Sequence, residues 1–195
     1  MSVRTQIYYP DGIYFITFTC ARWLPLFQIT NGYSAVYKWF DYLKYQGHYI
    51  IGYVIMPNHI HAIIGFGNAS KSINSIVGNG KRFMAYELIK LLKEQKQNDL
   101  LHQLEQMVND TDKKRNKKHE VFEPSFDRKE CRTIEFTKQK LDYIHMNPCR
   151  YETIKARLPE EYLYSSAKYY YTNQQGIYAV TSYMKMQDID LSLRR

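Results

Sequence analysis

The sequence predicts an α+β fold, in which an antiparallel sheet of about four strands is covered by helices. Three segments have the composition of strands, at 12–21, 49–56 and 59–66, and the last two are separated only by a Pro-Asn turn. Segments with helical periodicity lie between and after them. The resulting order, β-α-β-β-α-β-α, is that of a ferredoxin-like split βαβ unit.

The first half of the chain supplies three strands and one helix. Residues 12–21 (GIYFITFTCA) alternate and are rich in β-branched and aromatic side chains, as in a half-buried strand. Thr30 or Asn31 is the expected N-cap of a helix that runs to about Gln46, and Gly47 is expected to end it. The apolar positions of that helix lie on one face, at Val36, Phe40 and Leu43.

A second helix is expected over 72–94, where Gly78 and Gly80 weaken the middle and leave open a division into two pieces. Helical character continues to Met107, and a lysine-rich run from 113 to 118 follows. We interpret 95–120 as an insertion or exposed loop in the fold.

The fourth strand is expected at 121–126, and Pro124 assigns it to an edge of the sheet. A last helix is predicted from Thr133, a suitable N-cap, to Met146. Pro148 is expected to lie beyond its end.

Composition sets the class of protein. The 195 residues suit a single domain over 1–195, with 149–195 as a C-terminal extension, and 45% hydrophobic content excludes a disordered chain. A net charge of +8 favours a polyanionic partner, nucleic acid before membrane. The three cysteines contain no CxxC pair. Residues 1–11 lack an apolar signal core and no run approaches the ~20 residues of a membrane span, so we expect a cytoplasmic protein.

Two histidines one residue apart, His59 and His61, open the third strand. Successive side chains of a strand point to opposite faces, so both imidazoles share one face and the apolar side chains of Ile60, Ala62 and Ile64 share the other. Two neutral imidazoles on a rigid strand are typical of a divalent-metal site, whose third ligand must come from elsewhere. Two structural histidines are the alternative.

The last helix carries a polar stripe. Gln139, Tyr143 and Asn147 are spaced by four residues and therefore lie on one helix face. An amide oxygen suits a hard cation such as Mg²⁺ or Mn²⁺. A metal pair and a tyrosine together indicate a nuclease that attacks DNA through tyrosine, while packing of the ring against the sheet is the alternative for Tyr143.

These motifs resemble those of the single-tyrosine HUH transposases, and within them the REP-associated tyrosine transposases. Two blocks are specific in combination, HIH after a Met-Pro turn and YIHxNP on a late helix. The similarity covers most of the chain in the right order, through YFITFTCA at 14–21, MPNHIHAII at 56–64, VGNGKRFMAYEL at 77–88, YIHMNP at 143–148 and SSAKYYYT at 165–172.

The resemblance implies a role for each matching residue. It implies that His59 and His61 bind a divalent metal, Mg²⁺ or Mn²⁺, with Asn147 as a further ligand, and that Tyr143 is the nucleophile. The implied reaction cleaves and rejoins single-stranded, hairpin-containing DNA through a 5′-phosphotyrosine. It leaves open whether the chain works as a monomer or as a homodimer.

Basic and aromatic residues outside the site are candidates for holding the DNA. Lys81 and Arg82 are expected to contact phosphates. Tyr169 to Tyr171 could stack on unpaired bases or pack within the fold, and the lysine run could contact DNA or form a solvated loop. His145 points off the stripe and is interpreted as a packing residue or a DNA contact.

Two other functions remain open. A replication-initiator or relaxase nickase would keep the same fold, although such enzymes are usually larger. A domesticated DNA-binding protein would have lost cleavage, against which the intact His59, His61 and Tyr143 argue. A histidine-triad hydrolase is excluded, because its third alternating histidine would fall at Ile63.

Overall fold

The computed structural model describes residues 11–67, 71–151, 154 and 156–193. It contains a four-stranded sheet in the order β2-β3-β1-β4, with all neighbouring strands antiparallel. The predicted α+β architecture and the order of the split βαβ unit are confirmed. The strands are β1 (Gly12–Thr19), β2 (Tyr49–Ile55), β3 (His59–Phe66) and β4 (Asp127–Glu130).

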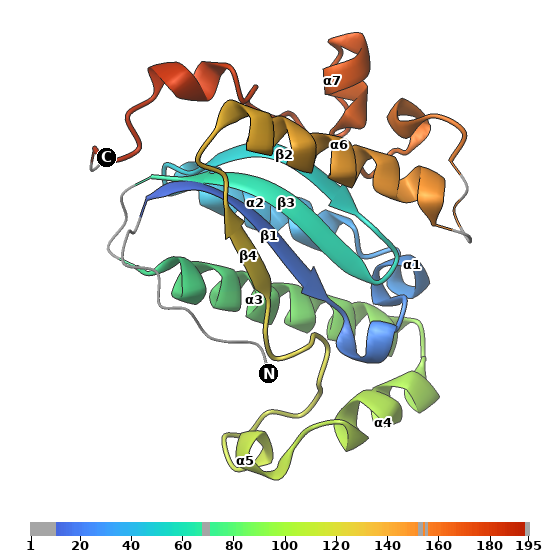
Figure 1. Ribbon diagram of the computed structural model, residues 1–195. Helices are drawn as coiled ribbons and strands as arrows, with labels where there is room; N and C mark the ends of the chain where they lie inside the picture. The colour runs from blue at the N-terminus through green and yellow to red at the C-terminus, as the bar shows by residue number, and fades with distance from the viewer. Residues whose placement is uncertain (1–10, 68–70, 152–153, 155, 194–195) are drawn as a thin grey trace.

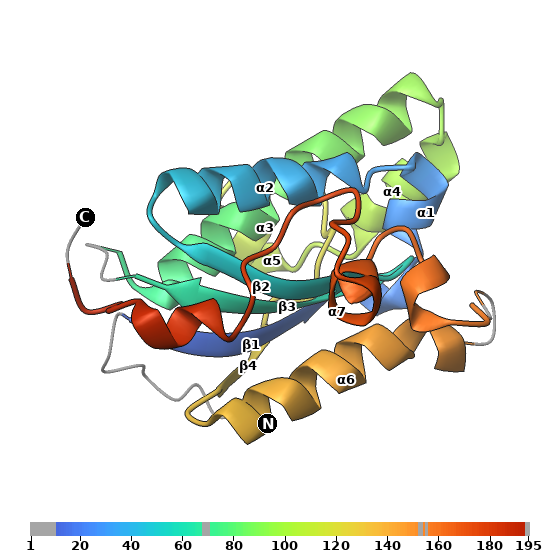
Figure 2. The ribbon, with the colours of Figure 1, turned by 90° about the horizontal axis from the view of Figure 1, so that it is seen from above.

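Helices cover both faces of the sheet. In Figures 1 and 2, α2 (Ser34–Tyr45) and α3 (Ile73–Glu94) lie on one side, and α6 (Ile134–Arg150) lies on the other. Each side has its own hydrophobic core, so the sheet is buried on both faces. The shorter helices are α1 (Leu26–Thr30), α4 (Asn98–Gln106), α5 (Asp110–Lys113) and α7 (Ala167–Thr172), with 3₁₀ turns η1 (Ala21–Trp23), η2 (Pro159–Glu161) and η3 (Lys185–Asp188).

The predicted β2–β3 hairpin is confirmed, and it forms the centre of the sheet. The amide of Met56 donates to the carbonyl of His59 across the turn at 2.8 Å. Strand β3 lies between β1 and β2 and is buried along its whole length. Its two histidines are therefore held by hydrogen-bonded neighbours on both sides.

The helix expected from Thr30 or Asn31 is instead two helices. Thr30 belongs to the last turn of α1, where its hydroxyl donates to the carbonyl of Leu26 at 2.6 Å. Asn31 adopts the left-handed conformation (φ 49°) that ends α1, and α2 begins only at Ser34. The predicted cap was therefore wrong, whereas the apolar face of the helix is buried as expected, at Val36, Phe40 and Leu43.

Helix α3 is continuous, so a division at its glycines does not occur. Ser72 caps it by accepting a hydrogen bond from the amide of Ser75. Gly80 allows a close approach, because an added Cβ would collide with the indole of Trp39. Packing against α2 thus offsets the low helix propensity of glycine.

The fourth strand lies later in the chain than predicted, at 127–130 instead of 121–126, although it is an edge strand as expected. Phe122 makes an isolated bridge with Cys20. Pro124 has no amide to donate, and the carbonyls of 123–125 accept hydrogen bonds from the ammonium of Lys81. Ladder pairing therefore resumes only at Asp127.

Helix α6 starts where predicted but ends later. The hydroxyl of Thr133 accepts from the amide of Phe136 at 3.1 Å and caps the helix. Pro148 was expected beyond the end, yet it lies inside the last turn, and the helix continues to Arg150. A proline so close to the C-terminus removes one intrahelical bond and leaves the preceding turns intact. This extra turn places Tyr151 over the sheet.

The segment after α6 packs on the edge strand β2. The carbonyl of Tyr164 accepts from the amide of Ile55 at 2.8 Å, and the amide of Ser166 donates to the carbonyl of Tyr53 at 3.0 Å. The C-terminal extension therefore covers a sheet edge that would otherwise be exposed.

The sequence predicts that residues 1–11 contain no apolar signal core. Residues 1–10 of this segment lie outside the described residues. Within the described part of the chain, the helices are too short or too polar to cross a membrane.

Candidate functional site

The two histidines lie on the face of β3 that is covered by α6. In the β1–β3 ladder His61 pairs with Thr17, and His59 pairs with Thr19. Their ring centroids are 4.7 Å apart. The division of faces predicted from alternation is correct, because the other face of β3 is buried in the core beneath α2 and α3, at Ile60, Ala62 and Ile64.

Each histidine makes a hydrogen bond through Nδ1. The Nδ1 of His59 lies 2.7 Å from Oδ1 of Asn58, and the Nδ1 of His61 lies 2.7 Å from the hydroxyl of Thr17. A carbonyl oxygen accepts only, so Nδ1 of His59 carries the proton and its Nε2 has a free lone pair. An oxygen partner on Nδ1 is the usual support for a histidine that binds metal through Nε2.

Burial keeps both imidazoles neutral. Loss of solvent lowers the pKa of His59 to about 4. Burial lowers the pKa of His61 to about 3, with smaller contributions from His59 and from the ammonium of Lys140. Both rings therefore have lone pairs for a metal at neutral pH.

Helix α6 places Tyr143 beside this pair. Leu141 and Ile144 anchor the helix in the core on this side of the sheet. Tyr143 remains 44% exposed, and its ring meets that of His61 edge-on at a centroid distance of 5.3 Å. The predicted nucleophile and the histidine pair thus lie side by side within one chain.

The same helix face continues past the histidines. Two turns after Tyr143, the hydroxyl of Tyr151 accepts from Nδ2 of Asn58 at 2.9 Å, and its ring lies 6.4 Å from that of His59. The half-buried Asn147 is midway between these two tyrosines on the i, i+4, i+8 stripe. The segment from Tyr143 to Tyr151 therefore runs along the histidine pair, and the helix spacing puts Asn147 between its two contacts.

These donors fit a hard divalent ion. Two neutral imidazoles and an amide oxygen are acceptable ligands for Mg²⁺ or Mn²⁺. No group of three His, Cys, Asp or Glu side chains suited to a metal occurs in the described residues. A site built on His59 and His61 would therefore depend on Asn147 and on oxygens of a bound phosphate.

Lys140 brings a positive charge to the site. Its ammonium lies 5.7 Å from the centroid of the Tyr143 ring and 5.2 Å from that of Phe15. Phe15 in turn stacks on His61 at 5.5 Å. A cation at this position favours negative charge on a bound phosphate or on the attacking oxygen.

Sequence reasoning missed several residues of the site. Asn58 follows Pro57 and was interpreted as a turn residue only, although it directly precedes His59. Thr17 lies on the predicted first strand, and its partner could not be known without the register. Contacts between distant segments also bring three further residues to the site, namely Trp23, Lys140 and Tyr151.

His145 and the tyrosine cluster have packing roles. His145 is 1% exposed, and its Nε2 lies 2.9 Å from the hydroxyl of Ser166. The hydroxyl of Tyr170 donates to the carbonyl of Ile51 at 2.8 Å, and Tyr169 packs against the core. Only the third tyrosine of the cluster is largely exposed, Tyr171 at 49%.

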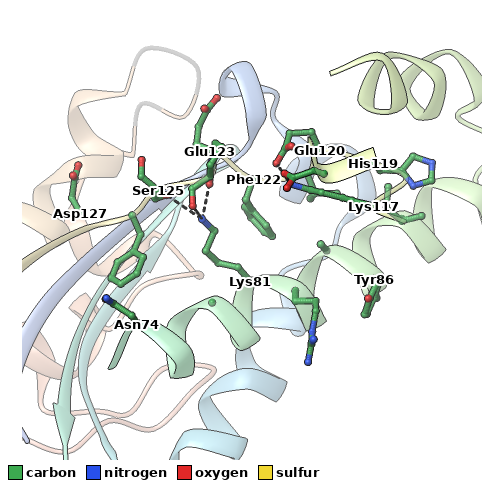
Figure 3. Close-up of a pocket in the computed structure, with 18 of the residues that line it drawn as sticks. Asn74, Lys81, Tyr86, Lys117, His119, Glu120, Phe122, Glu123, Ser125 and Asp127 are labelled. Atoms are coloured by element: carbon green, nitrogen blue, oxygen red, sulfur yellow. Dashed lines mark hydrogen bonds and ion pairs between the residues drawn. The ribbon is translucent and has the colours of Figure 1, made fainter. Parts of the chain in front are cut away.

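A groove of about 1360 Å³ lies between α3 and residues 112–132, away from the histidine pair. Figure 3 shows Lys81 pointing from α3 toward the backbone of 123–125. The ammonium donates to three successive carbonyls at 2.6, 3.4 and 3.0 Å, and the residue is 9% exposed. Burial also lowers its pKa to about 8. This geometry gives Lys81 a structural role, and the phosphate contact expected of it stays a prediction.

Arg82, in contrast, is exposed at the rim of the groove. The lysine run is partly structured, because Lys117 forms ion pairs with Asp112 at 3.2 Å and Glu120 at 2.5 Å. Arg115 and Lys118 line the groove with Arg82. The groove is therefore lined by exposed basic side chains and by Lys117, whose charge is paired with two carboxylates.

Comparison with known proteins identifies the fold. The solved structure of a REP-associated tyrosine transposase bound to a REP hairpin aligns with a TM-score of 0.59 and 15% identity, over 100% of this chain and 99% of that one. A candidate transposase from Deinococcus radiodurans R1 gives a TM-score of 0.44 and 14% identity, over 72% and 94% of the two chains. No protein-family model and no curated protein matches the sequence. The similarity to the REP-associated tyrosine transposase structure confirms the fold that the sequence motifs predicted.

Proposed function

We propose that the chain is a DNA endonuclease and strand transferase of the single-tyrosine HUH type, similar to the REP-associated tyrosine transposases. Tyr143 is the nucleophile, and the substrate is single-stranded DNA that contains a hairpin. The observation that carries the proposal is the contact of the Tyr143 ring with His61, whose neighbour His59 is 4.7 Å away. The shared fold of a transposase bound to a REP hairpin supports it.

His59, His61 and Asn147 would hold a divalent ion, Mg²⁺ or Mn²⁺. When bound, such an ion neutralises charge on the non-bridging oxygens of the phosphate and makes phosphorus more electrophilic. Asn58 keeps Nε2 of His59 available through its bond to Nδ1, and Thr17 holds the ring of His61 through a bond to its Nδ1.

Tyr143 would then carry out the covalent step. Its hydroxyl oxygen forms a bond to phosphorus while the bond from phosphorus to the 3′ oxygen breaks. The phenolic proton passes to solvent, which reaches the 44% exposed side chain, and the leaving 3′ oxygen takes up a proton. The products are a 5′-phosphotyrosine and a free 3′-hydroxyl.

The covalent intermediate allows rejoining. A 3′-hydroxyl attacks the phosphotyrosine, forms the new phosphodiester and releases the Tyr143 oxygen, so no external energy source is needed. Lys140 supports both directions, because its ammonium lies beside the ring on which the reacting oxygen is carried.

The DNA outside the site would be held by basic side chains. The net charge of +8 favours a polyanion. Arg82, exposed at the groove rim, is our candidate for a phosphate contact, whereas Lys81 is occupied by backbone carbonyls. Removal of a phosphate contact should weaken DNA binding by about the same factor for every DNA sequence.

A covalent-adduct assay tests the proposal. The protein is incubated with Mn²⁺ or Mg²⁺ and labelled hairpin DNA from the flanks of its own gene, and the products are separated on a denaturing protein gel. We expect a metal-dependent covalent band that is absent in Tyr143→Phe and in His59→Ala. Tyr45→Phe is the matched control, because Tyr45 is 86% exposed at the end of α2 and its variant should keep full activity.

The results of this assay distinguish the proposed function from its alternatives. A covalent band that persists in Tyr143→Phe would move the nucleophile to another residue and overturn the site assignment. Hairpin binding without cleavage by the unmodified protein would favour a DNA-binding protein that has lost its activity. Nicking of origin-like sequences without rejoining would favour a replication-initiator nickase.

A further inference from the structure

An exposed tryptophan stands at the rim of the histidine pair. The side chain of Trp23 is 62% exposed, and its ring lies edge-on to His59 with a centroid distance of 5.7 Å. The other tryptophan, Trp39, is 4% exposed and packs in the core. Trp23 therefore presents a large aromatic face to solvent directly beside the histidines proposed to hold the metal ion.

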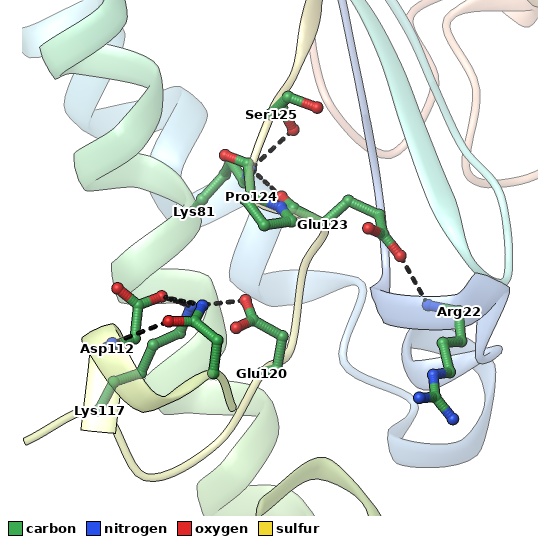
Figure 4. A network of polar contacts seen from close by, with 9 residues as sticks. Arg22, Lys81, Asp112, Lys117, Glu120, Glu123, Pro124 and Ser125 are labelled. Atoms are coloured by element: carbon green, nitrogen blue, oxygen red, sulfur yellow. Dashed lines mark hydrogen bonds and ion pairs between the residues drawn. The ribbon is translucent and has the colours of Figure 1, made fainter. Parts of the chain in front are cut away.

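The backbone that carries this ring is held in an unfavourable conformation. Arg22 and Trp23 have φ of 48° and 59°, in the left-handed region that bulky residues rarely adopt. The amide of Arg22 donates to a carboxylate oxygen of Glu123 at 2.8 Å, as Figure 4 shows. The amide of Trp23 donates to the carbonyl of Cys20 at 3.0 Å, and its carbonyl accepts from Nδ2 of Asn58 at 3.2 Å.

The anchor of this turn is itself fixed. Lys81 donates to the carbonyls of residues 123–125, so the backbone that carries the Glu123 carboxylate is tied to α3 (Figure 4). Asn58 links the turn to the site, because it bonds both the carbonyl of Trp23 and Nδ1 of His59. The protein therefore holds two residues in an unfavourable backbone conformation, which fixes the point from which the indole projects next to His59.

The exposed indole of Trp23 is suited to stack on an unpaired nucleobase. An exposed indole offers a π-face on which any nucleobase can stack, and such stacking tolerates sequence differences. Bases within a duplex are already stacked on their neighbours, so they cannot cover the ring without being extruded. Arg22, the exposed residue that precedes Trp23, adds a positive charge for a neighbouring phosphate.

We propose that Trp23 is a stacking platform for an unpaired nucleobase next to the phosphate held at the histidine pair. This proposal depends on the proposed function in one respect, that single-stranded DNA enters the site. It does not depend on the chemistry of Tyr143. Trp23 is thus a binding residue that orients the strand.

Tryptophan fluorescence tests the proposal directly, because the chain has two tryptophans. In a Tyr143→Phe background, which prevents reaction, Trp39→Phe leaves Trp23 as the emitting residue. Titration with a hairpin that has a single-stranded flank should quench this emission, whereas the same hairpin with the flank paired should not. The difference between the Trp23→Phe variant and its parent isolates the same signal if Trp39→Phe does not fold.

Affinity measurements provide the second readout. We expect Trp23→Ala to weaken binding of the flanked hairpin roughly tenfold to a hundredfold, and Trp23→Phe to retain most of the affinity. Tyr45→Ala is the matched control, because Tyr45 is 86% exposed at the end of α2, and its removal should leave binding unchanged.

The result that overturns the proposal is an unchanged dissociation constant in Trp23→Ala, or equal quenching by the paired flank. The covalent-adduct assay on the unmodified protein distinguishes this failure from that of the proposed function. Quenching by the single-stranded flank without any cleavage would support the platform and reject the nuclease. Cleavage with unchanged binding by Trp23→Ala would reject the platform alone.

Discussion

Replacing Asn58 with alanine is expected to lower both the stability of the fold and its affinity for metal. The side chain is 5% exposed and makes three hydrogen bonds, to Nδ1 of His59, to the carbonyl of Trp23 and to the hydroxyl of Tyr151. Each buried bond contributes about 1 kcal/mol net, so the free energy of unfolding should fall by roughly 2–4 kcal/mol. A domain of this size retains its fold after such a loss.

The effect on metal follows from the orientation of His59. Without the acceptor on Nδ1, the ring can rotate or change tautomer, and loss of such a partner typically costs tenfold to a hundredfold in metal affinity. Asn58→Asp is the matched variant, because it keeps an oxygen for Nδ1 of His59 and loses both donations. We therefore expect Asn58→Asp to keep the metal affinity while sharing part of the loss of stability.

Two measurements check this prediction. Urea unfolding without metal gives the change in stability, and titration with Mn²⁺ followed by electron paramagnetic resonance gives the affinity in a Tyr143→Phe background. The reasoning would be refuted if Asn58→Ala unfolded within about 0.5 kcal/mol of its parent and bound Mn²⁺ equally well. Equal loss of affinity in Asn58→Asp would show that the donations, and not the acceptor, orient the site.

Two further predictions concern buried charge. Burial lowers the pKa of His145 to about 3, and those of His59 and His61 to about 4 and about 3, so protonation favours the unfolded chain, whose histidines titrate near pH 6.5. Stability without metal should be full above that pH and fall by up to about 1.4 kcal/mol per pH unit for each of these histidines between about pH 6.5 and 4. His145→Gln should remove up to about 1.4 kcal/mol per pH unit of this slope in urea unfolding. Lys81→Met should lose about 2–3 kcal/mol of stability because three carbonyls lose a charged donor, while the exposed Arg82→Met should lose less than about 0.5. A weaker affinity for DNA in Lys81→Met without lower stability would restore its role as a phosphate contact.

The sequence by itself determined the elements whose signals are local. Alternation assigned His59 and His61 to the face of β3 opposite Ile60, because strand geometry has a period of two. Thr133 was recognised as a cap, since its hydroxyl bonds an amide three residues on. The order of these elements was sufficient for the fold class.

The exact ends of elements depended on contacts that local signals do not contain. Strand β4 was displaced because Lys81, 42 residues before Glu123, takes the carbonyls that precede it. Helix α6 passed through Pro148, since one lost hydrogen bond in a last turn does not end a helix that is anchored in the core.

The tertiary structure alone decided which side chains surround the residues that the motifs predicted. Nineteen tyrosines are equivalent in composition, and the packing of α6 on the sheet brings Tyr143 beside His61. Asn58 had the sequence signature of a turn, yet it bonds His59, Trp23 and Tyr151 together. These assignments needed the structure because hydrogen bonds and ring contacts between segments up to 93 residues apart have no periodicity in the sequence.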